Sequence, residues 1–200
     1  GLFNPLLLAD IRAPVPTDLE LPSFHCTCIT TGPNSGGKTR FLQAMALCQL
    51  LGQCGAFVPA RRAVLKCASG MFVSLGERSH ADQKEGRLGL ELMRIRRLFE
   101  RARPGSLVIL DELCSGTNPS EGEEIIRMLL ELLHELGHEV HVTTHFLQFA
   151  QMLTSEPATL GLNFLQVELD AEQHPTYRFV QGVATTSLAH QTAQRLGVTR

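Results

Sequence analysis

One short segment carries the residue types that bind a phosphate chain. Positions 32–39 fit the pattern G-x-x-x-x-G-K-[ST] at every fixed position. Glycines let the backbone wrap closely around phosphate oxygens, the lysine supplies a positive charge, and the threonine hydroxyl is placed to ligate Mg²⁺. A glycine-rich turn with a chance lysine is the alternative, which the flanking segments disfavour. The predicted nucleotide-binding residues are Gly32, Pro33, Asn34, Ser35, Gly36, Gly37, Lys38 and Thr39, the last also a metal ligand.

Two carboxylates follow an apolar run later in the chain. Residues 107–110 are all aliphatic, and Asp111 and Glu112 come directly after them. An all-apolar strand is typical of a parallel sheet covered on both faces, and ligands bind at the carboxyl edge of such sheets. Asp111 is therefore a predicted Mg²⁺ ligand, and Glu112 the predicted general base for an attacking water. A solvated, idle acidic pair at a strand end is the alternative.

The elements that must position these residues are visible in the pattern. Positions 26–31 are β-branched or small and apolar, which predicts a buried strand before the glycine-rich turn. Positions 41–51 predict a helix buried on most sides. Strand, turn and helix in this order place the helix amino terminus, with its partial positive charge, at the phosphates.

The remaining pattern predicts one α/β unit with a mostly parallel sheet covered by helices. Pro104 and Gly105 end one of its helices before the acidic strand. The expected segments are an irregular lead-in over 2–21, one or two strands over 63–75, a polar loop over 79–87, a helix over 88–102 with Leu88, Leu92, Ile95, Phe99 and Ala102 on one face, a helix over 121–136, a strand over 139–144, a hairpin from 164–169 and 177–180, and a last helix over 187–196.

Composition limits the classes of protein that fit. The 200 residues suffice for one sizeable core, and a net charge of −2 is unlike that of a freestanding nucleic-acid binder. No apolar run is long enough to cross a membrane, and no secretory pattern opens the chain, so we expect a cytoplasmic protein. The six cysteines lack paired C-x-x-C spacing and suit reduced core residues. A metal role for Cys26 and Cys28 is disfavoured, because no partner pair is near.

A cluster of arginines falls on the helix expected over 88–102 and just after it. A DNA contact is one interpretation, because phosphates attract such a basic stripe. The solvated outer face of an amphipathic helix is the favoured one, since Glu91 and Glu100 are interleaved. The arginines are Arg94, Arg96, Arg97, Arg101 and Arg103.

Longer stretches of the chain resemble a known family. The loop in its G-P-N-x-G-G-K form, the D-E-x-x-x-G-T stretch that opens at Asp111, and the segment 143–145 closely resemble the ATPase domain of the MutS family of DNA mismatch repair proteins. The likeness extends through 55–60 and 177–187, and so covers nearly the whole chain. The N-P-x-E-G wording after Thr117 is closer to the MutS-like branches than to the mismatch-sensing members.

The resemblance implies a P-loop NTPase of ABC-ATPase type that hydrolyses ATP with Mg²⁺ and works as a homodimer with two composite sites. It implies one ATPase domain over 1–200, with a lead-in over 1–25 and a core over 26–200. It also implies that His145 senses the γ-phosphate, although the residue alone equally suits a satisfied strand end. Val15 matches a position that stacks on adenine in the family. The segment implied to reach the partner's nucleotide is Ser115, Gly116 and Thr117.

The expected function is that of the ATP-hydrolysing motor of a MutS-like DNA repair or recombination protein. DNA would be bound through domains absent from this chain, and no membrane partner is expected. A nucleotide-gated dimerisation module with little turnover is the alternative, which the presence of Glu112 disfavours. A chromosome-maintenance ATPase is disfavoured because no heptad run occurs, and a small-molecule kinase because no acceptor-binding lid is recognisable.

Overall fold

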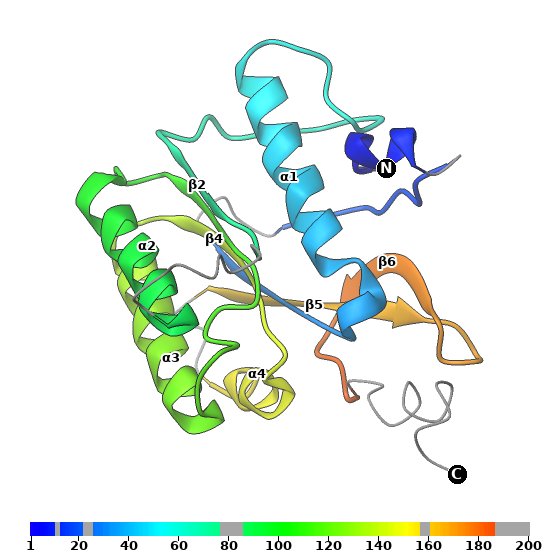
Figure 1. Ribbon diagram of the computed structural model, residues 1–200. Coiled ribbons are helices and arrows are strands. Elements are labelled where there is room, and N and C mark those ends of the chain that lie inside the picture. The colour runs from blue at the N-terminus through cyan, green and yellow to red at the C-terminus, as the bar shows by residue number, and fades with distance from the viewer. Residues whose placement is uncertain (11–12, 22–25, 77–85, 157–160, 187–200) are drawn as a thin grey trace.

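Short apolar and β-branched segments pair as a six-stranded sheet in the order β2-β3-β4-β1-β5-β6 (Figure 1). The computed structural model describes residues 1–10, 13–21, 26–76, 86–156 and 161–186. Neighbouring strands from β2 to β5 run parallel, and β6 returns antiparallel to β5. The strands are β1 (Thr27–Thr31), β2 (Met71–Ser74), β3 (Leu107–Leu110), β4 (Glu139–Thr143), β5 (Leu162–Leu169) and β6 (Pro175–Gln181).

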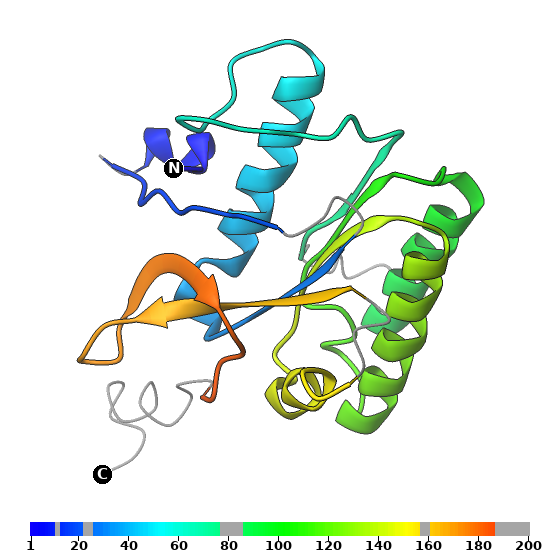
Figure 2. The ribbon, with the colours of Figure 1, turned by 180° about the vertical axis from the view of Figure 1, so that it is seen from behind.

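Helices cover both faces of this sheet, as its buried central strands require. One face carries α1 (Lys38–Gln53), and the other carries α2 (Arg87–Arg101), α3 (Pro119–Glu135) and α4 (Leu147–Leu153) (Figures 1 and 2). Alternation along each strand divides the core in two. Cys28 and Ile109 pack beneath α1, whereas Ile29 and Leu110 pack against the helices of the opposite face.

The helix boundaries follow from local residue chemistry. Asn118 caps α3 by accepting a hydrogen bond from Ser120 N, and Pro119 occupies the first turn, where no backbone donor is needed. Gly137, with φ of 70°, lies just after the carboxyl end of this helix. The chain then enters β4 directly, so α3 packs back against the sheet.

The lead-in packs on α1 and on the edge strand β6. Asn4 caps a short 3₁₀ turn, η1 (Pro5–Ala9), and its side-chain amide donates to Arg40 O on α1 at 2.9 Å. Leu2 and Thr17 pair as an isolated antiparallel bridge. The Thr17 hydroxyl accepts from Phe179 N of β6 at 3.1 Å, which attaches the lead-in to the hairpin.

Most of the predicted elements are confirmed, including β1, α1, β3, α3, β4 and the antiparallel hairpin. The strand expected over 63–75 is wrong in extent, because only 71–74 pair with β3. The predicted face of α2 is also wrong in part: Leu98 is buried, whereas Leu92 and Phe99 lie at the exposed margin. Helix α4 was not predicted. Residues 79–85 of the expected polar loop, and the expected last helix, lie outside the described residues.

None of the helices in the described part of the chain combines the length and apolar character needed to cross a membrane. All six cysteines are free thiols. Within the same described ranges, no group of three or more histidine, cysteine or acidic side chains is arranged to hold a metal ion.

Candidate active site

The glycine-rich loop connects β1 to α1 in a conformation that only glycine fits. Gly32 has φ of 135°, a 3₁₀ turn, η2 (Asn34–Gly36), follows, and Gly37 at φ of 85° precedes the first residue of α1. A Cβ built on Gly32 would lie 2.6 Å from Val167 Cγ2 of β5, and one on Gly36 would lie 2.7 Å from it. The loop is therefore pressed against β5, and its glycines are required by space as well as by backbone angle.

Lys38 is buried inside this loop, with 2% of its surface exposed. Its ammonium group donates to Gly32 O at 2.9 Å and to Pro33 O at 3.1 Å, and lies 3.8 Å from Glu112 Oε1. Burial lowers the pKa of Lys38, although the carboxylates of Glu112 and Asp111 act in the opposite direction. A desolvated cation held this way favours an incoming anion.

A chain of short hydrogen bonds joins the first turn of α1 to the ends of β3 and β4. Thr39 Oγ1 donates to Asp111 Oδ2 at 2.6 Å, and Thr143 Oγ1 donates to Asp111 Oδ1 at 2.6 Å. The same Thr143 oxygen accepts from Glu112 N at 2.8 Å. The structure thus brings both predicted metal ligands together. A hydroxyl and a carboxylate oxygen in contact are a donor set that suits Mg²⁺.

Glu112 departs from the strand in a left-handed backbone conformation. Its φ is 49°, a region that side chains other than glycine rarely adopt. The peptide N–H is fixed by Thr143, and the carboxylate, 28% exposed, points toward Lys38. Strain of this kind gathers at functional sites, and here it turns the carboxylate back over the phosphate loop.

The segment 115–117 is held by acidic side chains on its two flanks. Glu91 of α2 accepts from Cys114 N at 2.9 Å, and Thr117 Oγ1 donates to Glu121 at 3.1 Å. Gly116 is exposed at the tip, whereas the Ser115 hydroxyl is buried and has no hydrogen-bond partner in the described part of the chain. In this conformation the backbone around Gly116 is presented outward, and the Ser115 hydroxyl is turned inward.

His145 lies just after β4, at the same edge of the sheet as Asp111. Its ring packs on Phe146 with centroids 4.2 Å apart. Among the described residues the imidazole ring forms no hydrogen bond or ion pair, whereas the backbone carbonyl of His145 accepts from Leu147 N at 3.0 Å. The Phe146 N–H is bound by the Thr144 hydroxyl at 3.1 Å, which fixes the turn that carries the histidine.

Two residues of the site were not predicted from the sequence. Thr143 links Asp111 to Glu112, and the available signal was a hydroxyl at the end of an apolar strand. Tyr177 of β6 has φ of 61° and is 53% exposed, and a Cβ on Gly37 would lie 3.3 Å from its Cδ1. An exposed aromatic ring therefore stands beside the phosphate loop.

Val15 lies in the lead-in and is 39% exposed. Thr17, two residues after Val15, accepts a hydrogen bond from Phe179 N of β6. Tyr177 lies two residues before Phe179 on the same strand. The lead-in that carries Val15 is thus attached to the strand that carries the tyrosine, close to the loop.

Comparison with known proteins agrees with this geometry. Residues 28–199 match the family described as MutS domain V. The chain is 37% identical over 197 residues to the protein named endonuclease MutS2 of Thermomicrobium roseum, covering 98% of this chain and 24% of that protein. Proteins of the same name from Caldanaerobacter subterraneus and Agathobacter rectalis are 32% and 34% identical over 96% and 98% of this chain, each covered over 24% of its length. The chain belongs to the MutS family and carries its domain V, an ATP-binding ATPase domain of the ABC type.

Proposed function

We propose that residues 1–200 form one ATPase domain that binds ATP with Mg²⁺ and acts as the motor of a DNA repair or recombination protein. The observation that carries the proposal is the series of hydrogen bonds from Thr39 through Asp111 and Thr143 to Glu112 N. The Lys38 ammonium lies 3.8 Å from the carboxylate oxygen Oε1 of the same Glu112. This arrangement gathers a cation, an oxygen donor pair and the Glu112 carboxylate at one loop.

Each group then has a role in the hydrolysis. The N–H groups of the loop and the Lys38 ammonium bind the β- and γ-phosphates. Thr39 and Asp111 would hold Mg²⁺, which when bound would neutralise charge on the phosphate oxygens. Glu112 accepts a proton from water as the water oxygen bonds to the γ-phosphorus. The bond to the β-phosphate oxygen breaks, and ADP and phosphate leave.

The base of the nucleotide is expected between the lead-in and the hairpin. Val15 offers only an aliphatic surface, whereas Tyr177 offers a half-exposed ring beside Gly37. A valine and a tyrosine hold a base by shape and stacking and supply few polar contacts, so the site is proposed to discriminate little between bases.

The active form is proposed to be a homodimer in which each site is shared. The exposed backbone at Gly116, with Ser115 and Thr117, would reach the γ-phosphate bound by a second copy. His145 would sense the γ-phosphate of the nucleotide that its own chain binds.

DNA contact within the whole protein is assigned to parts beyond this chain, which spans 24% of the length of the relatives it matches. The six free thiols suit a cytoplasmic protein.

Glu112→Gln tests the chemistry. The amide keeps the shape and loses the base, so turnover should fall by about 100-fold or more while ATP still binds. Asp111→Asn is the matched control, because it should raise the Mg²⁺ concentration needed for half-maximal activity. Turnover by Glu112→Gln at the wild-type rate would exclude the base. A wild-type chain that binds ATP without single-turnover hydrolysis would favour the nucleotide-gated dimerisation module instead.

Sharing between two chains is tested by mixing. Lys38→Ala removes the phosphate contact, and Gly116→Arg blocks the exposed segment that faces a partner. Neither variant alone forms a complete site, but a mixed dimer retains one made from Lys38 of one chain and Gly116 of the other. Activity should recover on mixing and should rise with protein concentration. Activity that is independent of concentration, with no recovery, would contradict the shared site.

A further inference from the structure

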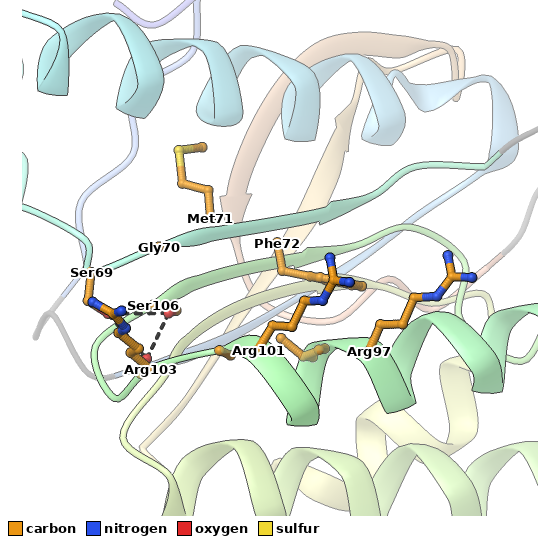
Figure 3. A pocket seen from close by; sticks show the side chains of 10 residues that line it. Ser69, Gly70, Met71, Phe72, Arg97, Arg101, Arg103 and Ser106 are labelled. Carbon is orange, nitrogen blue, oxygen red and sulfur yellow. Dashed lines mark hydrogen bonds between the residues drawn. The ribbon is translucent and has the colours of Figure 1, made fainter.

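Exposed arginines of α2 lie in two different surroundings. Arg96 is 81% exposed and donates to Glu100 one turn along the helix at 2.8 Å, as a solvated helix face would. Arg97 and Arg101 instead line a hollow of about 310 Å³, together with Arg103 from the turn after the helix (Figure 3). The favoured interpretation from the sequence therefore describes only part of this cluster.

The hollow lies at the end of the strands opposite to the proposed nucleotide site. Gly70 precedes β2 and Ser106 precedes β3, and both residues line it, so it opens at the amino ends of these strands. Asp111 follows the carboxyl end of β3. A ligand in the hollow would thus occupy a second site at the opposite edge of the sheet.

The walls leave the guanidinium groups as the available donors. Ser69 Oγ donates to Pro104 O at 2.8 Å, and Ser106 Oγ donates to Arg103 O at 2.7 Å, so both hydroxyl hydrogens are used within the turn. These bonds fix the turn that carries Arg103. Phe72 of the edge strand is half-buried and supplies an aromatic side chain to the lining of the hollow (Figure 3).

Among the described residues, no acidic side chain neutralises the charge in the hollow. Arg97, Arg101 and Arg103 are exposed, and none of them forms an ion pair within the described ranges of the chain. Arg97 and Arg101 are separated by one helical turn, about 6 Å along the axis. Guanidinium groups bind phosphate oxygens through paired hydrogen bonds, more strongly than neutral donors do.

We propose that this arginine hollow, lined by Arg97, Arg101, Arg103 and Phe72, binds the backbone phosphates of single-stranded nucleic acid. The aromatic wall favours a nucleic-acid strand over an acidic peptide, because bases stack on aromatic and guanidinium faces and carboxylate side chains do not. The site goes beyond the proposed ATPase function, since it gives this domain a nucleic-acid contact of its own.

The test is a titration of the 200-residue chain with a fluorescent thymidine oligonucleotide at several salt concentrations, without ATP. Replacing both Arg97 and Arg101 by alanine should weaken binding about tenfold or more at low salt. The slope of log K against log salt should become shallower by about 1.4, or about 0.7 for each lost phosphate contact. Arg96→Ala is the control: it removes one positive charge from the same helix outside the hollow and should change affinity less than about twofold.

Further arms identify the source of any binding. The double variant Arg97→Lys and Arg101→Lys should keep the salt slope and lose part of the affinity, because charge remains while the paired geometry is lost. A saturating non-hydrolysable ATP analogue should leave the oligonucleotide bound. The proposal fails if the wild-type chain does not bind the oligonucleotide at low salt, if Arg96→Ala loses as much affinity as the double variant, or if the ATP analogue displaces the strand. Equal competition by polyglutamate would assign the hollow to acidic peptides instead.

Discussion

Thr143 donates a 2.6 Å hydrogen bond to Asp111 from the end of the adjacent strand. Because its oxygen also accepts from Glu112 N, one buried hydroxyl sets the position of the metal carboxylate and of the peptide that precedes the base side chain. The contact depends on the sheet order, in which β4 lies directly beside β3.

Thr143→Val tests this role with the shape of the side chain preserved. It leaves a buried N–H and a carboxylate oxygen without their partner, so turnover should fall about tenfold, within the usual effect of an unmade hydrogen bond. The Mg²⁺ concentration for half-maximal activity should rise at the same time. Thr143→Ser retains the hydroxyl and should restore both quantities. An unchanged Mg²⁺ dependence in the valine variant would show that Thr143 serves stability alone.

Lys38→Met should separate stability from binding. The variant removes a buried charge, so the free energy of unfolding at pH 7 should rise by about 1 kcal/mol while ATP binding weakens about tenfold or more. Burial holds the pKa of Lys38 in the folded chain below its ordinary 10.5. At pH values between the folded and the unfolded pKa, Lys38 is protonated in more of the unfolded chains than of the folded ones. The free energy of unfolding of the wild type therefore rises with pH across that range. The stability difference between methionine variant and wild type should therefore shrink at alkaline pH, as measured by urea unfolding. A less stable methionine variant at pH 7 would contradict this account.

Tyr177→Ala should weaken ATP binding several-fold, because an aromatic contact contributes about 0.5–1.5 kcal/mol. Tyr177→Phe keeps the ring and should bind ATP as the wild type does. Calorimetric titration of ATP and of inorganic triphosphate distinguishes the base from the phosphates. If the alanine variant loses equal affinity for both, the ring acts on the loop and not on the base.

Thiol labelling provides a check on burial. Burial raises the pKa of Cys26 to about 11, of Cys28 to about 12 and of Cys114 to about 11. At pH 8 these thiols stay protonated and enclosed, whereas Cys54 and Cys67 are exposed. Iodoacetamide followed by mass spectrometry should label Cys54 and Cys67 first. Labelling of Cys114 at the same rate would show that the segment before Ser115 opens in solution.

The sequence predicted the parts of the site that depend on neighbours along the chain. The loop, Lys38 and the pair Asp111 and Glu112 belong to strand ends whose apolar pattern is local and strong. Thr143 and Tyr177 were missed because their roles arise from strand order and from a left-handed backbone angle, which no local pattern encodes.

The same distinction explains the errors in the fold. Helix α4 has only seven residues, too few for a clear helical period. The apolar stretch over 63–70 suggested a strand, but none of these residues lies in a strand of the sheet. Its residue Ala68 packs against the part of the core beneath α1. On α2, Leu98 takes a core position that the chosen spacing had given to Leu92 and Phe99.

Val167 limits the space beside the phosphate loop. Its two methyl groups stand where side chains on Gly32 and Gly36 would otherwise be, so the curvature of the loop is set by a strand more than a hundred residues away in sequence. That strand is paired with β6, which carries Tyr177. The hairpin and the loop are therefore coupled through Val167. A shift of the hairpin that moves Tyr177 would also change the space available to phosphates in the loop.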